Sequence, residues 1–317
     1  LVLLGSVVYF NQVGLPDFLK APLLRQLHAG GWNVQFDRLR LDWTKGIVAE
    51  QVVLAEARET EGPTIRFGGV ILEPDWAELI RFRFRLRALR LHDGVLALPL
   101  SPDEPQLPPA RIDTVQAELR FLPGDRWELA RLSAEGSGIR LRATGFLTHA
   151  SAVRGWARDP VPAGSTPAPA IWQSHLRRGM AYARQWTFGR PPVLNVFIGG
   201  DARDPAGMRA ELSLEAEAIG SRWGTLERLS VWSELNRASN IPGLGLSEAI
   251  VNFRGARTAW GMIQSGQWEV QWMQAFTNLL PAKVEWRLNL DRLQSPWGET
   301  PRRSEEHTSE LQSPNTI

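Results

Sequence analysis

Histidine and acidic residues are the first candidates for chemistry in this chain, because metal binding and proton transfer depend on them. The four histidines before residue 300 are His28, His92, His149 and His175, and they are widely scattered. None has a second histidine at the spacing that a zinc-binding helix requires. Asp201 and Asp204 are too few acidic groups for a calcium loop. The sequence therefore predicts no metal site, no cofactor and no catalytic residues, and we expect that the protein is not an enzyme.

The glycine-rich segments do not indicate nucleotide binding. The segments Gly199-Gly200-Asp201 and Gly243-Leu244-Gly245 lack the strand–loop–helix context of a phosphate-binding loop. A Gly-x-Ser-x-Gly nucleophile turn is also missing from the sequence. His92-Asp93-Gly94 is predicted to be a hairpin turn rather than a catalytic pair. The remaining information lies in the pattern of apolar residues.

Composition indicates a folded, mostly neutral protein. The chain has 317 residues, of which 43% are hydrophobic and 22% charged, enough for one large domain or two ordinary ones. Its 36 basic and 34 acidic residues nearly balance, and most arginines alternate with apolar residues, so we do not expect a nucleic-acid partner. The absence of cysteine excludes disulfides and thiolate zinc sites. Many of the 14 tryptophans occupy apolar positions, which favours a structural role.

From Trp32 onward apolar residues recur at every second position, which is the pattern of β-strands with one apolar and one wet face. In places the alternation slips by one residue and then resumes, as it does between Phe36 and Leu39. The chain is therefore predicted to be mainly β. The apolar positions of these strands are Val34, Phe36, Leu39, Leu41, Ile65, Phe67, Phe82, Phe84, Leu86, Leu89, Leu91, Val115, Leu119, Phe121, Ile139, Leu141, Leu212, Leu214, Trp268, Val270, Trp272, Val284, Trp286 and Leu288.

Only a few segments favour helix. The apolar run over residues 1–12 is interpreted as the end of a transmembrane anchor, and the alternative is a short buried segment. A short helix is expected over residues 16–29. An amphipathic helix is expected over residues 171–188, packed on the sheet or lying on a membrane. The Pro-rich stretch over residues 159–170 is a linker or a long loop.

Two further patterns bear on the architecture. The segment Leu212-x-Leu214-x-Ala216, followed by Trp223-Gly224, recurs as Trp286-x-Leu288-x-Leu290 followed by Trp297-Gly298. This suggests stacked units that extend one sheet. Two helices cannot cover so many strands, so the apolar face either packs against a second sheet or lines a groove in a curled sheet.

A family resemblance favours the groove. The stretches WNVQFDRLRLDWTKGIVAEQVVL over residues 32–54 and PDWAELIRFRFRLRALRLHDGVLALPL over residues 74–100 resemble the start of AsmA-like proteins of the bacterial envelope. Those are related to the chorein-type, bridge-like lipid transfer proteins. In that family a strand pair is followed by a short Asp-Trp helix, here Asp75–Leu79, and then by two strands joined at Asp-Gly. The resemblance is good over residues 1–150 and thinner over residues 171–302.

The resemblance implies a single-pass inner-membrane protein whose body lies in the periplasm. Its strands would form an elongated, strongly twisted and curled antiparallel sheet with an apolar groove, built from modules at residues 13–158 and 171–302. The apolar positions given above would line that groove and hold phospholipid acyl chains on their way to the outer membrane. Outer-membrane proteins are a further expected partner. The alternatives are an envelope assembly factor for outer-membrane proteins and a plain β-sandwich scaffold.

Residues 303–317 resemble the in-frame translation of a sequencing-library adapter and are predicted to be a non-native tail. We expect that deleting them leaves the melting temperature unchanged within error, because a non-native tail has no selected role in the fold. Differential scanning calorimetry of the full and shortened chains measures this. A fall of several degrees would mean that the tail is part of the fold.

Overall fold

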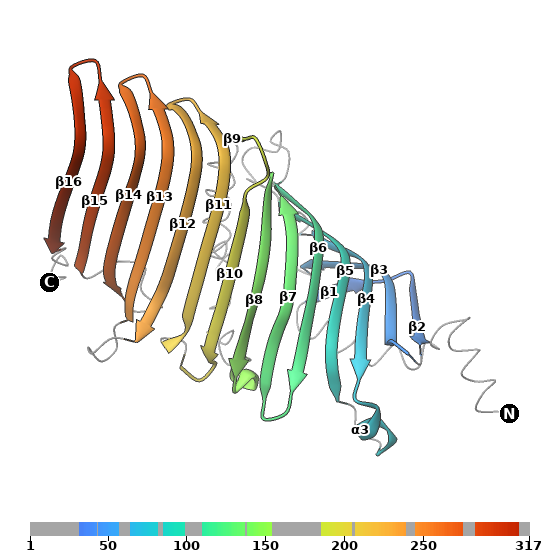
Figure 1. Cartoon of the computed structure of the whole chain (residues 1–317). Coiled ribbons are helices and arrows are strands. Elements are labelled where there is room, and N and C mark those ends of the chain that lie inside the picture. The colour runs from blue at the N-terminus through green and yellow to red at the C-terminus, as the bar shows by residue number, and fades with distance from the viewer. Residues whose placement is uncertain are drawn as a thin grey trace, which may run out of the picture. The chain divides into compact units, whose positions relative to one another are not determined.

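The computed structural model describes residues 32–42, 44–56, 64–81, 85–98, 110–136, 138–153, 185–204, 207–238, 245–274 and 283–310. Over these residues the chain is mainly β, with sixteen strands and one short α-helix (Figure 1). It divides into two compact units. The first comprises residues 1–123 and 127–137, and the second comprises residues 124–126 and 138–317.

The first unit is an open sheet. Its hydrogen-bonded order is β1-β3-β4-β5-β6-β7, and β2 pairs with β3 beside β1. Helix α3 connects β4 to β5. The bounds are β1 Trp32–Gln35, β2 Arg38–Asp42, β3 Gly46–Glu56, β4 Thr64–Pro74, α3 Trp76–Ile80, β5 Leu86–Leu98, β6 Ala110–Leu122 and β7 Arg126–Gly136.

The second unit is also an open sheet, with strands that are curved along their length (Figure 1). Its order runs from β8 through β10 to β16, and β9 pairs with β11. The prediction of an antiparallel sheet is correct for these pairs except β8 and β10, which are parallel. The bounds are β8 Ile139–Thr148, β9 Thr187–Phe188, β10 Val193–Asp201, β11 Arg209–Ser221, β12 Gly224–Ala238, β13 Gly245–Thr258, β14 Gly261–Gln274, β15 Lys283–Ser295 and β16 Gly298–Glu310.

The short helix expected from the Asp-Trp motif is present as α3. Asp75 precedes it and caps it, because its Oδ1 accepts hydrogen bonds from the backbone N–H groups of Ala77 at 3.1 Å and Glu78 at 3.4 Å. The helix ends in a turn where the Arg81 N–H donates to the Glu78 carbonyl at 3.0 Å. Of the apolar strand positions predicted at Phe82, Phe84 and Leu86, Leu86 begins β5, and Phe82 and Phe84 lie outside the described residues.

The predicted hairpin at His92-Asp93-Gly94 is wrong. These residues lie inside β5, which pairs with β4 on both sides of them, Leu91 with Val70 and Gly94 with Phe67. Asp93 has a φ of 51°, so the left-handed conformation that Asp tolerates is used within a strand rather than in a reversing turn. Pairing with β4 along the whole strand overrides the local turn preference.

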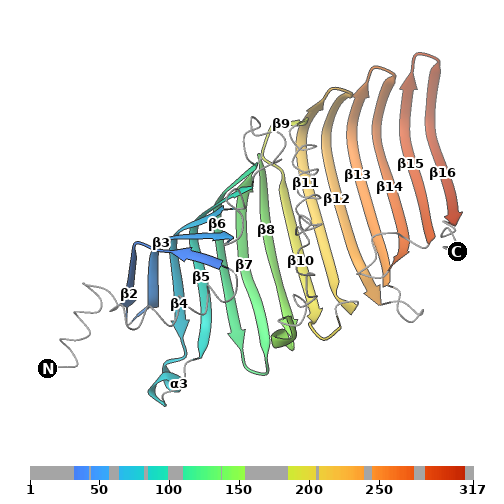
Figure 2. The same ribbon diagram turned by 180° about the vertical axis from the view of Figure 1, so that it is seen from behind.

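Left-handed residues explain slips of the apolar alternation that occur inside strands, whereas the slip between Phe36 and Leu39 lies at the connection between β1 and β2. Gln51 of β3 has a φ of 53° and lies level with Gly68 of β4 and Asp93 of β5. Ala49 and Val52, on either side of Gln51 and three residues apart, belong to the same buried cluster. The left-handed residue therefore returns the apolar side chains to the same face after the slip. Figure 2 shows the first unit's strands changing direction along their length.

The second unit repeats this arrangement. Ala218 of β11, Gly255 of β13 and Arg292 of β15 have φ values of 50°, 67° and 50°. The strand registers place all three at the same level of the sheet, with Glu227 and Gln264 between them on β12 and β14. We call these five residues the left-handed row, after the three of them that have a positive φ. Beyond it the apolar positions again shift by one residue, from Ala216 to Ile219 on β11.

Several predictions fall on residues outside the described ranges. These are the anchor at 1–12, the helix at 16–29, the Pro-rich segment at 159–170 and most of the helix at 171–188. The predicted end of that last helix is wrong, because Thr187 and Phe188 form β9. None of the helical residues that the structure describes belongs to a helix long and apolar enough to cross a membrane. β16 continues through residues 303–310, which pair with β15, so the predicted tail supplies the outer part of an edge strand.

The close packing around Gly94 gives a stability test. A Cβ atom at this position would lie 2.8 Å from both the Phe67 ring and the Val115 Cβ. Gly94→Ala should therefore lower the free energy of unfolding by about 1–3 kcal/mol, the usual cost of overpacking. Gly69→Ala is the matched control, because a Cβ there meets no atom within 4 Å. Urea denaturation measures both, and equal effects of the two substitutions would contradict the packing described.

Candidate functional site: the apolar face of the second unit

One face of the second unit is apolar across its strands. Val251 of β13 lies opposite Trp268 of β14, which in turn lies opposite Leu288 of β15. Neighbouring strands place directly paired side chains on the same side of a sheet. The registers extend this face to β12, β11, β10 and β8, where Leu194 lies opposite both Leu214 and Leu141.

The structure brings together all the predicted apolar positions of this unit. On the shared face lie Ile139, Leu141, Leu212, Leu214, Trp268, Val270, Trp272, Val284, Trp286 and Leu288. The same face holds residues that the sequence analysis did not single out, although they alternate in the same way. These are Leu194, Val196, Ile198, Leu229, Val231, Val251 and Phe253.

Large side chains on this face remain open to solvent. Ile198 is 41% exposed and Trp268 is 43% exposed, whereas smaller residues such as Ala210 and Ala216 are buried. Among the described residues, these strands make their extensive contacts with their neighbours in the sheet. The face also contains a shallow hollow of about 370 Å³, lined by Val251, Phe253, Trp268, Trp286 and Leu288.

The opposite face of the same strands is polar. Its hollow of about 570 Å³ is lined mainly by Arg228, Ser230, Asn252, Arg254, Ser265, Gln267, Asn289 and Asp291. Ion pairs such as Arg228 with Glu217, at 2.8 Å, lie on this side. The two serines on the apolar face are hydrogen-bonded to backbone groups, since Ser233 donates to the Glu248 carbonyl and Ser247 accepts from the Asn236 N–H. The sheet is therefore amphipathic across its thickness.

In the first unit, the predicted apolar positions are buried or partly buried by other side chains. Val34, Leu39, Ala49, Val52 and Phe67 form a buried cluster in which each side chain is less than 10% exposed. Seven of the predicted groove positions belong to this cluster or pack against it, so protein side chains occupy that part of the apolar face. These seven are Val34, Phe36, Leu39, Ile65, Phe67, Leu91 and Val115. Five others, Leu41, Leu86, Leu89, Leu119 and Phe121, are half-buried.

Strands β11 to β16 of the second unit form a threefold repeat of a hairpin. Trp260-Gly261 joins β13 to β14 in the same way that Trp223-Gly224 joins β11 to β12 and Trp297-Gly298 joins β15 to β16. The three tryptophans are spaced by 37 residues, and so are Ala218, Gly255 and Arg292 of the left-handed row. The sequence analysis found the outer two copies and missed the middle one, whose strand reads Ala249-x-Val251-x-Phe253.

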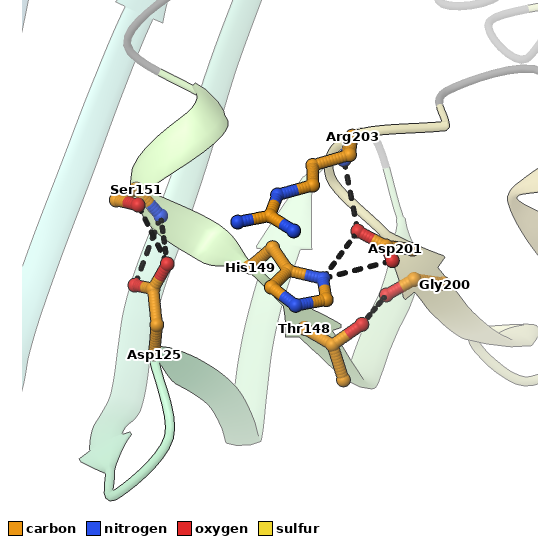
Figure 3. A network of polar contacts seen from close by, with 7 residues as sticks. All are labelled: Asp125, Thr148, His149, Ser151, Gly200, Asp201 and Arg203. Atoms are coloured by element: carbon orange, nitrogen blue, oxygen red, sulfur yellow. Dashed lines mark hydrogen bonds and ion pairs between the residues drawn. The ribbon is translucent and has the colours of Figure 1, made fainter.

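A polar network of the second unit joins the ends of β8 and β10 (Figure 3). His149 Nδ1 lies 2.9 and 2.8 Å from the two carboxylate oxygens of Asp201, which also accepts the Arg203 N–H at 2.9 Å. Asp125 accepts from Ser151 nearby. Within the described part of the chain, no group of three metal-ligating side chains occurs. The network ties the end of the parallel strand pair together, so we assign it to stability.

Acid titration tests that assignment. The Arg203 N–H, with help from His149, lowers the pKa of Asp201 below its ordinary value of 3.8. The ionised carboxylate therefore stabilises the folded state at neutral pH, and this contribution is lost as the pH falls through the lowered pKa. Asp201→Asn should lower the melting temperature at neutral pH, and the difference from wild type should shrink in acid. Glu215→Gln, on the polar face, is the control and should change neither; a difference at Asp201 that is independent of pH would contradict the role of the charge.

Comparison with known proteins adds no relative. No protein-family model matches the chain, and no curated protein matches it. The resemblance to AsmA-like proteins therefore rests on the sequence patterns given above. What the structure establishes is an open, mainly β chain whose second unit has one apolar and one polar face.

Proposed function

We propose that this protein is a lipid conduit, in which the apolar face of the second unit carries phospholipid acyl chains. The observation that carries the proposal is the exposure of large apolar side chains, Trp268 and Ile198 among them, on a face that extends from β8 to β15. Monomeric soluble proteins rarely leave a contiguous apolar surface of this kind without an occupant.

The energetics suit an acyl chain. Exposing a chain of about sixteen carbons to water costs on the order of 10 kcal/mol, at about 0.8 kcal/mol per methylene. Seven strands at their usual spacing give a continuous apolar path of roughly 30 Å, so a chain can move along it without entering water. Lipid transfer of this kind needs no bond to form or break, which agrees with a site made mainly of apolar side chains.

The proposal includes a compartment and a direction. The apolar start of the chain at residues 1–12 would anchor it in the inner membrane, and the body would lie in the periplasm. Phospholipid would then pass toward the outer membrane and contribute to outer-membrane biogenesis. These elements derive from the AsmA-like sequence patterns.

The β-sandwich alternative has less support. In a sandwich, a second sheet covers the apolar face of the first at about 10 Å. The described strands of the second unit follow one another in a single hydrogen-bonded order, and Trp268 on the apolar face is 43% exposed. A face that packed on a second sheet would bury its largest side chain.

Site-specific photo-crosslinking in cells tests the conduit. A photoreactive amino acid in place of Trp268 should form phospholipid adducts, because this exposed position lines the hollow of the apolar face. The matched control is the same amino acid at Gln267, the residue before Trp268, which lines the hollow on the polar face. Mass spectrometry of the purified adducts identifies the lipid. Adducts of equal yield at both positions would indicate mere closeness to a membrane, and adducts at neither would exclude the proposal.

A charge introduced on the apolar face tests whether lipid transfer uses this face. Val251→Asp should slow phospholipid transfer between donor and acceptor vesicles, because a carboxylate beside the path is costly for an acyl chain to pass. Asn252→Asp places the same charge on the polar face and should leave transfer unchanged. Circular dichroism of both variants confirms that each retains its strand content. Unimpaired transfer by a folded Val251→Asp protein would contradict the path proposed.

A further inference from the structure

The three hairpin turns of the repeat present tryptophans at one end of the second unit's strands. Figure 1 shows the turns between β11 and β12, β13 and β14, and β15 and β16 side by side at the same edge. Trp223 is 41% exposed, Trp260 is 63% exposed and Trp297 is 82% exposed. At the usual strand spacing, tips two strands apart are separated by about 10 Å. We call these three residues the tip row.

The three turns have the same pair of hydrogen bonds around the backbone of the tryptophan. The backbone N–H of Trp223 donates to Ser221 Oγ at 3.2 Å, and Ser221 Oγ donates to the Gly224 carbonyl at 3.2 Å. Thr258 makes the same two bonds at Trp260 and Gly261, at 3.1 and 3.3 Å. Ser295 makes them at Trp297 and Gly298, at 3.3 and 3.1 Å.

A glycine follows each tryptophan for a conformational reason. The φ values of Gly224, Gly261 and Gly298 are 149°, 152° and 151°, a region that residues with a side chain rarely adopt. The hydroxyl bonds and the glycine together make a rigid turn. Such a turn does not require tryptophan, since its bonds involve only the backbone of that residue. The repeated indole therefore points to contact with something outside the sheet.

The chemistry around the tips fits a membrane surface. Tryptophan is the side chain that concentrates at the boundary between lipid head groups and acyl chains, because its ring is apolar and its N–H needs a polar partner. Trp186 adds a fourth ring, with its centroid 6.1 Å from that of Trp223. The Arg222 guanidinium lies over the Trp223 ring, 4.3 Å from its centroid.

The charges at this edge are mainly positive. From the left-handed row outward, the three hairpins and residues 185–190 contain four arginines and two glutamates. The arginines are Arg190, Arg222, Arg257 and Arg292, and the glutamates are Glu227 and Glu299. Arg257 is ion-paired with Glu227 at 3.5 Å and Arg190 with Glu217 at 3.8 Å, so attraction to anionic phospholipid comes from the remaining excess of basic residues, at about 1 kcal/mol for each one near the membrane.

We propose that the tip row docks the second unit onto the surface of a phospholipid bilayer, with the indoles of Trp223, Trp260 and Trp297 at the head-group boundary and the arginines against anionic lipid. Because the turns lie at the strand ends, docking leaves both faces of the sheet uncovered. The inference does not depend on lipid transport, since a sheet that carries no acyl chain could dock in the same way.

The natural absence of cysteine makes a local test possible. Ala259→Cys and Pro296→Cys each place a single thiol beside a tip tryptophan without removing it. A polarity-sensitive fluorophore on either thiol should shift to the blue when the full-length protein meets vesicles containing phosphatidylglycerol. Lipids with a spin label in the acyl chain should then quench it. The signal should be weaker with phosphatidylcholine alone, because the arginines lose their anionic partners.

Two controls separate docking from other contacts. A fluorophore at Asn252→Cys, on the polar face, should show neither the shift nor the quenching. Replacing all three tip tryptophans with serine in the Ala259→Cys protein should weaken the vesicle response more than about tenfold, because even partial burial of three indoles exceeds the free energy of a tenfold change. Trp232→Ser, which removes a 37% exposed tryptophan from the polar face, should leave it unchanged.

The outcomes that overturn the proposal are distinct from those that overturn the conduit. No vesicle response at positions 259 and 296, or a response that survives the triple substitution, excludes docking through the tip row. A blue shift that depends on protein concentration without vesicles means that a second copy of the chain covers the row, and also excludes it. A fluorophore at Trp268→Cys reports lipid on the apolar face separately, so the conduit can fail while docking holds, or the reverse.

Discussion

The structure depends on keeping every apolar side chain of a unit on one side of its sheet. Strict alternation alone would move the apolar residues to the wrong face wherever the sequence slips by one position. Within several strands the slips coincide with left-handed residues, Gln51 and Asp93 in the first unit and Ala218, Gly255 and Arg292 in the second. These residues lie level with one another within each unit, and pairing continues past them without an inserted residue between β3 and β4 and between β11 and β12. Between β5 and β6 the register shifts next to Asp93.

Both units keep their apolar side chains on one side of the sheet, but only the first unit covers them with its own side chains. In the first, Val34 on β1 and Leu39 on β2 pack with Val52 and Phe67, so the apolar face is filled by the chain's own side chains and supplies a core. In the second, small residues such as Ala210 and Ala216 are buried while Trp268 stays exposed, so the large side chains form a surface instead. A core stabilises the fold, and an open apolar surface is available for an occupant.

The repeat also places a row of tryptophans at one edge of the second unit. One hairpin of 37 residues per repeat adds two strands to the sheet and one turn to the edge, so the face and the tip row grow together. The hydroxyl residue and the glycine of each turn have structural reasons to recur, whereas the tryptophan between them is explained by neither. Two lipid-facing surfaces, one on the sheet and one at its rim, would then arise from a single repeated unit.

The sequence by itself determined the mainly β class and the side chains that share a face within each alternating run, because alternation is a local property, and the family resemblance placed the short helix after Asp75. Sequence reasoning could not distinguish a left-handed residue within a strand from a hairpin turn at Asp93-Gly94, since both use the same local conformation and only pairing with β4 separates them. It also could not decide which apolar residues are covered. Phe67 and Trp268 show the same alternation, yet one is buried and the other exposed, because coverage depends on which distant segment returns to the face. That information exists only in the tertiary structure.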